Sequence, residues 1–180
     1  VGVSMSGMIL PYKGTLPTIA KDAFIAPNAV VIGNVTIGAR TGIWFNCVLR
    51  GDVYTIHVGE GTNLQDGTIV HVSGGTHPTW IGSHVTVGHM CLIHGCRLED
   101  NSFIGMSATV MDGCIVESGA MVAAGSLLTP GKRVPSGELW SGRPAKFTRK
   151  ISPEDAAGFA RTAPHYAELA AEYRHGLGLK

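Results

Sequence analysis

The sequence predicts an all-β fold, a parallel β-helix built from hexapeptide repeats, followed by an α-helical segment at the C-terminus. Aliphatic residues recur at every sixth position, often directly before glycine, which is the signature of a hexapeptide solenoid. The composition agrees, because 25 glycines with only 15% charged residues suit many tight corners. The C-terminal helix is indicated by Ser152, a typical N-cap residue that is followed by proline and two acidic residues.

The six-residue period persists over about a hundred residues, which excludes both the 3.6-residue period of a helix and the alternation of a long strand. Each hexapeptide supplies one short strand and one corner, and three of them make a triangular coil. Residues 18 positions apart in an uninterrupted run therefore stack about 4.8 Å apart. We expect about six coils between Phe24 and Pro135. The predicted inward positions are Ile25, Val31, Ile37, Ile43, Leu49, Val58, Leu64, Val70, Ile81, Val87, Ile93, Leu98, Ile104, Val110, Val116, Val122 and Leu128.

Two interruptions break this count. Extra length lies between Leu49 and Val58, and a loop with the sequence VSGGTHPTW lies between Val70 and Ile81. Loops that break a regular solenoid tend to mark its working face. We therefore expect the functional site beside these two segments.

The chain divides into an N-terminal extension (1–18), a β-helix domain (19–147) and a C-terminal helical segment (148–180). Residues 1–7 precede Met8 and are left out of the fold prediction. Pro164 is expected to divide the helical segment into helices over 153–161 and 164–174, because proline interrupts a helix interior. Gly176 is expected to close the second helix.

Charge and hydropathy exclude several functions. The formal net charge is +1, and no long run of lysine and arginine is present, which argues against a nucleic-acid surface or an anionic membrane surface. No apolar segment reaches the roughly 18 residues that a transmembrane helix needs, and no signal-peptide pattern opens the chain, so we expect a cytoplasmic protein. The cysteines form no C-x-x-C pair and are predicted to be free, buried thiols: Cys47, Cys91, Cys96 and Cys114.

Three histidines fall on predictable positions of the prism. His71 follows inward Val70, and His94 follows inward Ile93, so both point outward from the same side of adjacent coils and can share a metal ion. His89 is 18 residues after His71, but the loop consumes part of that interval and places His89 on a different side. A three-fold assembly, with side one of one chain against side three of the next, would bring a neighbour's His89 to the pair. Three histidines with an open fourth position are typical of catalytic zinc.

A single outward histidine on a solenoid is usually a surface residue, and the other histidines show no comparable register. Of these, His77 is the one loop residue placed to approach the site. The others are interpreted as structural or surface residues: His57, His84, His165 and His175.

The polar motifs resemble those of the gamma-class carbonic anhydrases, over about residues 19–147. The resemblance is carried by Leu49-Arg50-Gly51-Asp52, Asn63-Leu64-Gln65-Asp66-Gly67, His71, Val87-Gly88-His89 and His94-Gly95-Cys96. It implies a left-handed β-helix, a homotrimer, and metal sites at the three subunit interfaces that hold Zn²⁺, or alternatively Fe²⁺ or Co²⁺. It also implies the reversible hydration of CO2 to bicarbonate by a metal-bound hydroxide, with His71 and His94 from one subunit and His89 from the next.

The resemblance also assigns roles to single residues. Gln65 would hold the metal-bound water, Asn63 would line the CO2 pocket, and Tyr166 corresponds to a tyrosine that some members place near the metal. Arg50 would pair with the aspartates across the interface in a structural role, since a guanidinium fork suits two carboxylates. Those aspartates are Asp52 and Asp66.

Two departures from the family pattern affect the expected rate of CO2 hydration. Val53 stands where active members have glutamate directly after Arg-Gly-Asp, and the VSGGTHPTW loop contains no acidic residue. Hydration of CO2 releases a proton, so without a positioned acid the turnover is expected to be weak and limited by buffer or by His77.

Two other functions remain open on the same prism. A hexapeptide acyltransferase that uses acyl-coenzyme A generally relies on one histidine as a base and needs no metal, so three histidines in ligand register count against it. A non-catalytic, metal-binding trimeric scaffold is favoured by the missing acidic residues.

Overall fold

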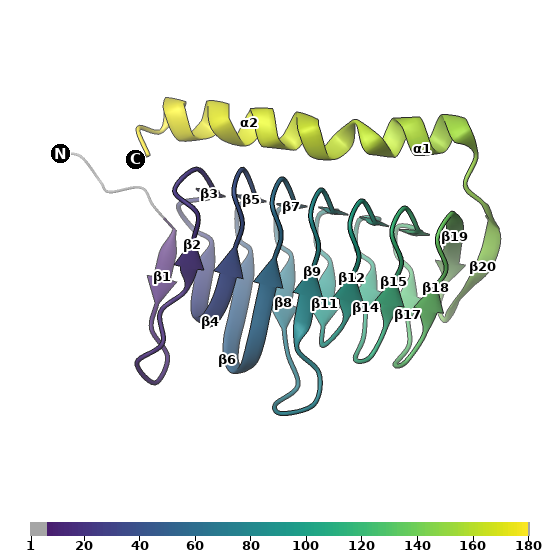
Figure 1. The fold of residues 1–180 in the computed structure, drawn as a ribbon, viewed down its shortest axis with the longest axis horizontal. Helices are drawn as coiled ribbons and strands as arrows, with labels where there is room; N and C mark the ends of the chain where they lie inside the picture. Colours follow the sequence, from purple (N-terminus) through teal and green to yellow (C-terminus); the bar gives the residue numbers. More distant parts are fainter. Residues whose placement is uncertain (1–6, 180) are drawn as a thin grey trace.

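Successive coils of a left-handed parallel β-helix stack along the long axis of the molecule, and a helical rod runs along its outside (Figure 1). The computed structural model describes residues 7–179. Within them the predicted all-β fold with a C-terminal helical segment is confirmed. Strands of neighbouring coils pair in parallel, in the register that the six-residue count requires.

The strands form the three faces of the prism, which we call sides one, two and three. Side one contains β1 (Met8–Leu10), the first part of β4 (Val30–Ile37), the first part of β6 (Val48–Val58), β8 (Ile69–His71), β11 (Leu92–His94), β14 (Thr109–Val110) and β17 (Leu127–Leu128). Side two contains β2 (Thr18–Ile19), the last parts of β4 and β6, β9 (Thr79–Ile81), β12 (Arg97–Leu98), β15 (Ile115–Val116) and β18 (Arg133–Val134). Side three contains β3 (Phe24–Ile25), β5 (Gly42–Ile43), β7 (Asn63–Leu64), β10 (Thr86–Val87), β13 (Phe103–Ile104), β16 (Met121–Val122) and β19 (Glu138–Gly142).

The aliphatic residues that the count places inside the prism form its core. Leu49, Val70 and Ile93, which stack on side one, are all 0% exposed. Burial of each such side chain stabilises the fold by about 1.5–3 kcal/mol relative to leaving it in water. The same packing fixes the register, because a slip of one residue would turn the inward set outward.

The N-terminal end differs from the prediction. β1 pairs in parallel with β4, so Met8–Leu10 already belongs to the solenoid. The sequence sets residues 1–18 apart as an extension, because a single coil is too short to reveal the six-residue period. At the other end, β19 pairs antiparallel with β20 (Ala145–Lys150), a hairpin that closes the stack.

The helical rod lies against side three, where α2 contacts β3, β5 and β7. It consists of α1 (Pro153–Ala160) and α2 (Thr162–Gly176). The predicted N-cap is confirmed: the Ser152 side chain accepts a hydrogen bond from the Asp155 backbone N–H in a capping box. Neither helix within residues 7–179 is long and apolar enough to cross a membrane.

The predicted position of the helix break is wrong. The break lies at Arg161, and Pro164 falls inside the first turn of α2. Proline is tolerated there because the first N–H groups of a helix have no intrahelical acceptor, so its missing N–H breaks no bond.

All four cysteines are free and buried, which confirms the prediction from their spacing. Burial raises the pKa of the Cys47 thiol to about 12 and that of the Cys91 thiol to about 11. Burial also raises the pKa of the Cys96 and Cys114 thiols. Since the thiolate is the reactive form, these side chains are inert near neutral pH.

We expect the native protein to resist an aromatic disulfide reagent at pH 8, because the raised pKa values leave almost no thiolate and the sulfur atoms are inaccessible. In denaturant all 4 thiols should react. The absorbance of the released aromatic thiol measures the extent of reaction in the native and in the denatured protein. Rapid stoichiometric labelling of the native protein would contradict this account.

Candidate metal centre

The structure brings His71 and His94 together on side one. β8 and β11 pair with His71 directly opposite His94, and the ring centroids are 5.0 Å apart. His71 Nδ1 lies 3.0 Å from His94 Nε2. The predicted register of these two side chains is therefore confirmed.

The remaining nitrogen of each ring is held by a carboxylate. His71 Nε2 lies 3.0 Å from Asp52 Oδ1, and His94 Nδ1 lies 2.5 Å from Asp112 Oδ1. A carboxylate accepts hydrogen bonds, so His71 Nε2 and His94 Nδ1 are the N–H donors in these contacts. The lone pairs of His71 Nδ1 and His94 Nε2 then face each other across 3.0 Å, an arrangement that needs a proton or a cation between them.

A divalent metal ion fits this arrangement. Two nitrogens bound to one tetrahedral zinc ion at about 2.0–2.1 Å are about 3.3 Å apart, close to the observed separation. Carboxylate partners on the far nitrogens are the usual support of metal-binding histidines, because they fix the tautomer and raise the basicity of the ligand. The donor set suits zinc and other divalent first-row metals.

Both supporting carboxylates are held in the anionic form. Burial opposes ionisation of Asp52, but hydrogen bonds from His71 and Arg50 outweigh it and hold the pKa of the Asp52 carboxyl below its usual range. For Asp112, burial is likewise outweighed, by hydrogen bonds from Ser73 and His94, and its pKa is lowered.

His89 lies on side three, just after β10, and one nitrogen of its ring is likewise held by a carboxylate. Its Nδ1 is 2.9 Å from Asp66 Oδ2, which leaves Nε2 as the nitrogen available to a ligand. Within residues 7–179 no three metal-binding side chains of one chain converge on a common point. His89 is thus separated from the His71–His94 pair, as expected from their places on different sides.

Gln65 and Asn63 lie on side three with His89. The Gln65 backbone N–H donates to the carbonyl of Val87, in the strand that leads to His89, at 2.9 Å. Gln65 Nε2 donates to Asn63 Oδ1 at 3.1 Å, and Asn63 Nδ2 donates to Thr86 Oγ1 at 3.0 Å. These contacts leave Gln65 Oε1 as the acceptor at the end of the network.

Within one chain, Arg50 pairs with one of the two aspartates that the resemblance assigns to it. It forms an ion pair with Asp52 inside one chain, where Asp52 also holds His71. Asp66 contacts His89 rather than Arg50. The pairing of Arg50 with these aspartates across a subunit interface stays a prediction, and the contact of Asp66 with the histidine in the next coil was not foreseen from the sequence.

Tyr166 lies on α2, above side three. Its ring packs edge-on against Trp44 at a centroid distance of 5.3 Å. Burial, followed by the nearby Asp66 charge, raises the pKa of the Tyr166 hydroxyl. Tyr166 is therefore on the side that carries His89, away from the His71–His94 pair.

The sequence prediction missed Asp112 and Ser73. Asp112 lies 18 residues after His94 in a coil of 17 residues, because Ile93 pairs with Val110, so the repeat count places it one coil on from His94 and one position past direct register. Ser73 Oγ donates to Asp112 Oδ2 at 2.6 Å and lies in the loop that breaks the repeat. His77, from the same loop, lies over Gly95 and near Asp112, so its predicted approach to the site is confirmed.

Fold and side chains together define a class: a hexapeptide-repeat β-helix protein with a histidine site on its side faces. The profile described as "Bacterial transferase hexapeptide (six repeats)" matches residues 17–51 and 95–130. A solved structure of a hexapeptide transferase family protein from Anaplasma phagocytophilum is similar with a TM-score of 0.89 and 50% identity, covering 92% of this chain and 98% of that one.

Similar curated proteins identify the family more closely. The chain is 41% identical to "Carbonic anhydrase" of Geobacillus kaustophilus, over 93% of this chain and 91% of that protein. It is 54% identical to "Gamma carbonic anhydrase 2, mitochondrial" of Arabidopsis thaliana, over 86% of this chain and 57% of that protein. The chain belongs to the gamma carbonic anhydrase family. It spans 57% of the length of the Arabidopsis thaliana relative.

The packing around Gly95 generates a stability prediction. Gly95 has a φ of +55°, and an added Cβ would collide with the Asp112 carboxylate and with His77. Gly119 has a φ of +67° with open space around it. We expect Gly119→Ala to lose only the cost of the left-handed conformation, about 1–2 kcal/mol.

Gly95→Ala should lose more stability than Gly119→Ala, because Asp112 and His77 must also move. The midpoints of thermal unfolding of the two variants measure the difference. Equal midpoints would show that the contact between Gly95 and Asp112 is loose.

Proposed function

We propose that the protein is a metal-dependent carbonic anhydrase that reversibly hydrates CO2 to bicarbonate. The observation that carries the proposal is the pair of carboxylate-held imidazoles whose facing nitrogens lie 3.0 Å apart. His71, His94 and a neighbouring subunit's copy of the third histidine, His89, would hold Zn²⁺, or alternatively Fe²⁺ or Co²⁺. A divalent ion held there would act as a Lewis acid that lowers the pKa of a water molecule toward neutrality.

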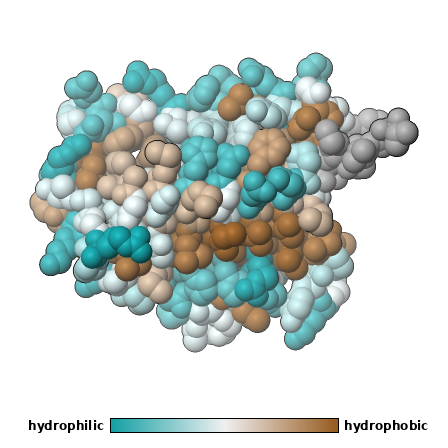
Figure 2. All heavy atoms as spheres, turned by 180° about the vertical axis from the view of Figure 1, so that it is seen from behind, coloured by the Kyte–Doolittle hydropathy of each residue, from teal (hydrophilic) through white to brown (hydrophobic). Residues whose placement is uncertain are grey.

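A homotrimer with the site at its interfaces is part of the proposal. An apolar band runs along side one, directly beside the row that contains His71 and His94 (Figure 2). In it, Met8 is 53% exposed, and Ile69 and Leu92 are each 39% exposed. A continuous exposed apolar stripe is typical of an interface. It supports packing of side one against another copy, which can present His89 from side three.

The side-chain network on side three suits the task of orienting a water molecule. Thr86 holds the Asn63 amide, and Asn63 in turn fixes the Gln65 amide with its Nε2 bonded inward. The free acceptor, Gln65 Oε1, can then accept a hydrogen bond from a water molecule and so fix the direction of the lone pairs on that water. Asn63 would in addition line the CO2 pocket, and Tyr166 would lie at the edge of the same face.

The release of the product proton would depend on buffer. Val53 stands in place of an acid, and the loop over residues 72–78 offers only His77 as a titratable group. His77 lies near Asp112, on the far side of His94 from the facing nitrogens. The proposal therefore includes a slow turnover at low buffer concentration.

The central test combines metal analysis with CO2 hydration. Purified protein loaded with zinc, or anaerobically with iron, should have the mass of a trimer, bind about one ion per chain, and hydrate CO2 above buffer background. His94→Ala should lose both the ion and the activity, whereas His175→Ala, at an exposed position of α2, should retain both. Stopped-flow pH-indicator assays measure the rate. If the metal-replete wild-type protein released no protons from CO2 above buffer background, the proposed carbonic anhydrase activity would be refuted.

A second prediction concerns the proton. The initial rate should rise with the concentration of an imidazole buffer, because the buffer supplies the missing proton acceptor. Val53→Glu should weaken this dependence, whereas Val53→Gln, of the same size and without an acid, should not. A wild-type rate that is independent of buffer concentration would instead indicate a proton acceptor within the protein.

An acyltransferase is the second candidate, favoured by the family description and by the similar structure of a hexapeptide transferase family protein. Such a reaction would need a histidine base and no metal ion. Transfer or hydrolysis of an acyl-coenzyme A that persists in the presence of a chelator would favour it. Metal binding without either activity would favour the non-catalytic scaffold.

A further inference from the structure

We propose that Ser73 and Asp112 are positioning residues for His94, and that the loop over residues 72–78 breaks the hexapeptide repeat in order to supply Ser73. This inference rests on the proposed metal centre and adds two residues to it. Neither residue would touch the ion. Both would act by holding one imidazole in a single orientation.

The contacts form a chain from the loop to the ring nitrogen of His94 that lies away from the proposed ion. Ser73 Oγ donates to Asp112 Oδ2 at 2.6 Å, and the other carboxylate oxygen, Oδ1, lies 2.5 Å from His94 Nδ1. Because both oxygens of the Asp112 carboxylate are hydrogen-bonded, the carboxylate cannot rotate without losing a hydrogen bond. His94 Nδ1 is then fixed as the protonated nitrogen, and Nε2 is directed toward His71.

The loop itself is held in place. The Ser73 backbone N–H donates to the His77 carbonyl at 3.0 Å, and the His77 N–H donates back to the Ser73 carbonyl at 3.1 Å. This tight bridge fixes the backbone that carries the serine hydroxyl.

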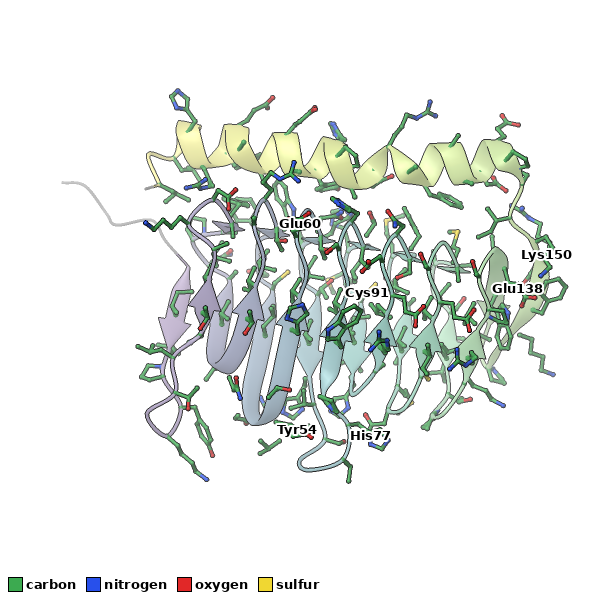
Figure 3. The ribbon with its side chains drawn as sticks, viewed as in Figure 1. Tyr54, Glu60, His77, Cys91, Glu138 and Lys150 are labelled. Atoms are coloured by element: carbon green, nitrogen blue, oxygen red, sulfur yellow. The ribbon has the colours of Figure 1, made fainter. Side chains whose placement is uncertain are left out.

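The other interruption of the repeat serves His71 in the same way. The bend of β6 supplies Asp52, which holds His71 Nε2 and is itself fixed by Arg50 and by the Val53 backbone N–H at 2.8 Å. Figure 3 shows Tyr54 and His77, which belong to the two segments, at the same lower edge of the prism. Each segment that departs from the repeat thus supports one of the two histidines.

The space for this support depends on Gly95. Any Cβ at this position would occupy the place of the Asp112 carboxylate, and His77 covers the same residue from the loop. The glycine that follows His94 is therefore what allows a carboxylate from the next coil to reach the ring. Loss of such a hydrogen-bonded support typically weakens metal affinity 10–100-fold.

Zinc affinity, measured by competition with a chromophoric chelator on the assembled protein, tests the inference. We expect Asp112→Ala to weaken binding about 10–100-fold, because His94 loses its orientation. Asp112→Asn keeps a hydrogen-bond acceptor for Nδ1 and should recover part of the loss. Ser73→Ala should weaken binding less than Asp112→Ala does.

Asp100→Ala is the matched control. Asp100 also bridges coils at a corner, where its Oδ1 accepts from the Ser83 backbone N–H at 2.8 Å, and among residues 7–179 no ion pair joins it to a histidine. Its removal should leave zinc affinity unchanged. The visible spectrum of bound Co²⁺ gives a second readout, which should change in Asp112→Ala and not in the control.

The outcomes separate the two proposals. If wild type binds zinc and His94→Ala does not, while Asp112→Ala and Ser73→Ala bind like wild type, the positioning role is overturned and the metal centre stands. If wild type binds no more tightly than His94→Ala, the metal centre fails and the positioning role fails with it. Should Asp112→Ala fail to fold, Ser73→Ala decides, since it removes a single hydroxyl.

Discussion

The parallel hydrogen-bond ladder between coils is the constraint on which the site depends. It holds adjacent strands about 4.8 Å apart and therefore sets the separation of His71 and His94 before any ligand arrives. A flexible loop would have to give up conformational entropy to bring two imidazoles together, whereas the solenoid has already done so in folding. The ladder cannot set the rotation of each ring. The two aspartates are needed for this, because a ring rotated by half a turn would place carbon atoms where its two nitrogens should lie.

The core and the histidine register follow from the sequence because both depend on counting. Inward residues must be apolar at every sixth position, so the β-helix can be recognised from the sequence. Any residue that follows an inward one can then be assigned to a side of the prism. The loop length before Ile81 was enough to show that His89 does not stack on His71. The count places Asp112 one coil on from His94, but an aspartate at a corner carries no sequence signal that its partner is a histidine.

Other features depended on information that no local pattern contains. The consequence of Pro164 depends on where α2 begins, and only the packing of the helix against side three sets that. The strand Met8–Leu10 belongs to the solenoid through its pairing with β4, yet a single coil has no period to detect. The contact of Asp66 with His89 depends on the alignment of two corners in adjacent coils, which the aliphatic repeat does not determine.

The placement of the site residues on two different sides of the prism has a consequence for the free energy of subunit association. His71 and His94 occupy side one, whereas His89 and Gln65 occupy side three, and inward core residues lie between them, so one chain cannot turn both sets toward the same point. If an ion joins them, its binding free energy is shared between chains and adds directly to the free energy of association. Metal and subunit contacts would then stabilise each other: the apolar band on side one brings the copies together, and the ion selects the one alignment in which three prepared nitrogens meet.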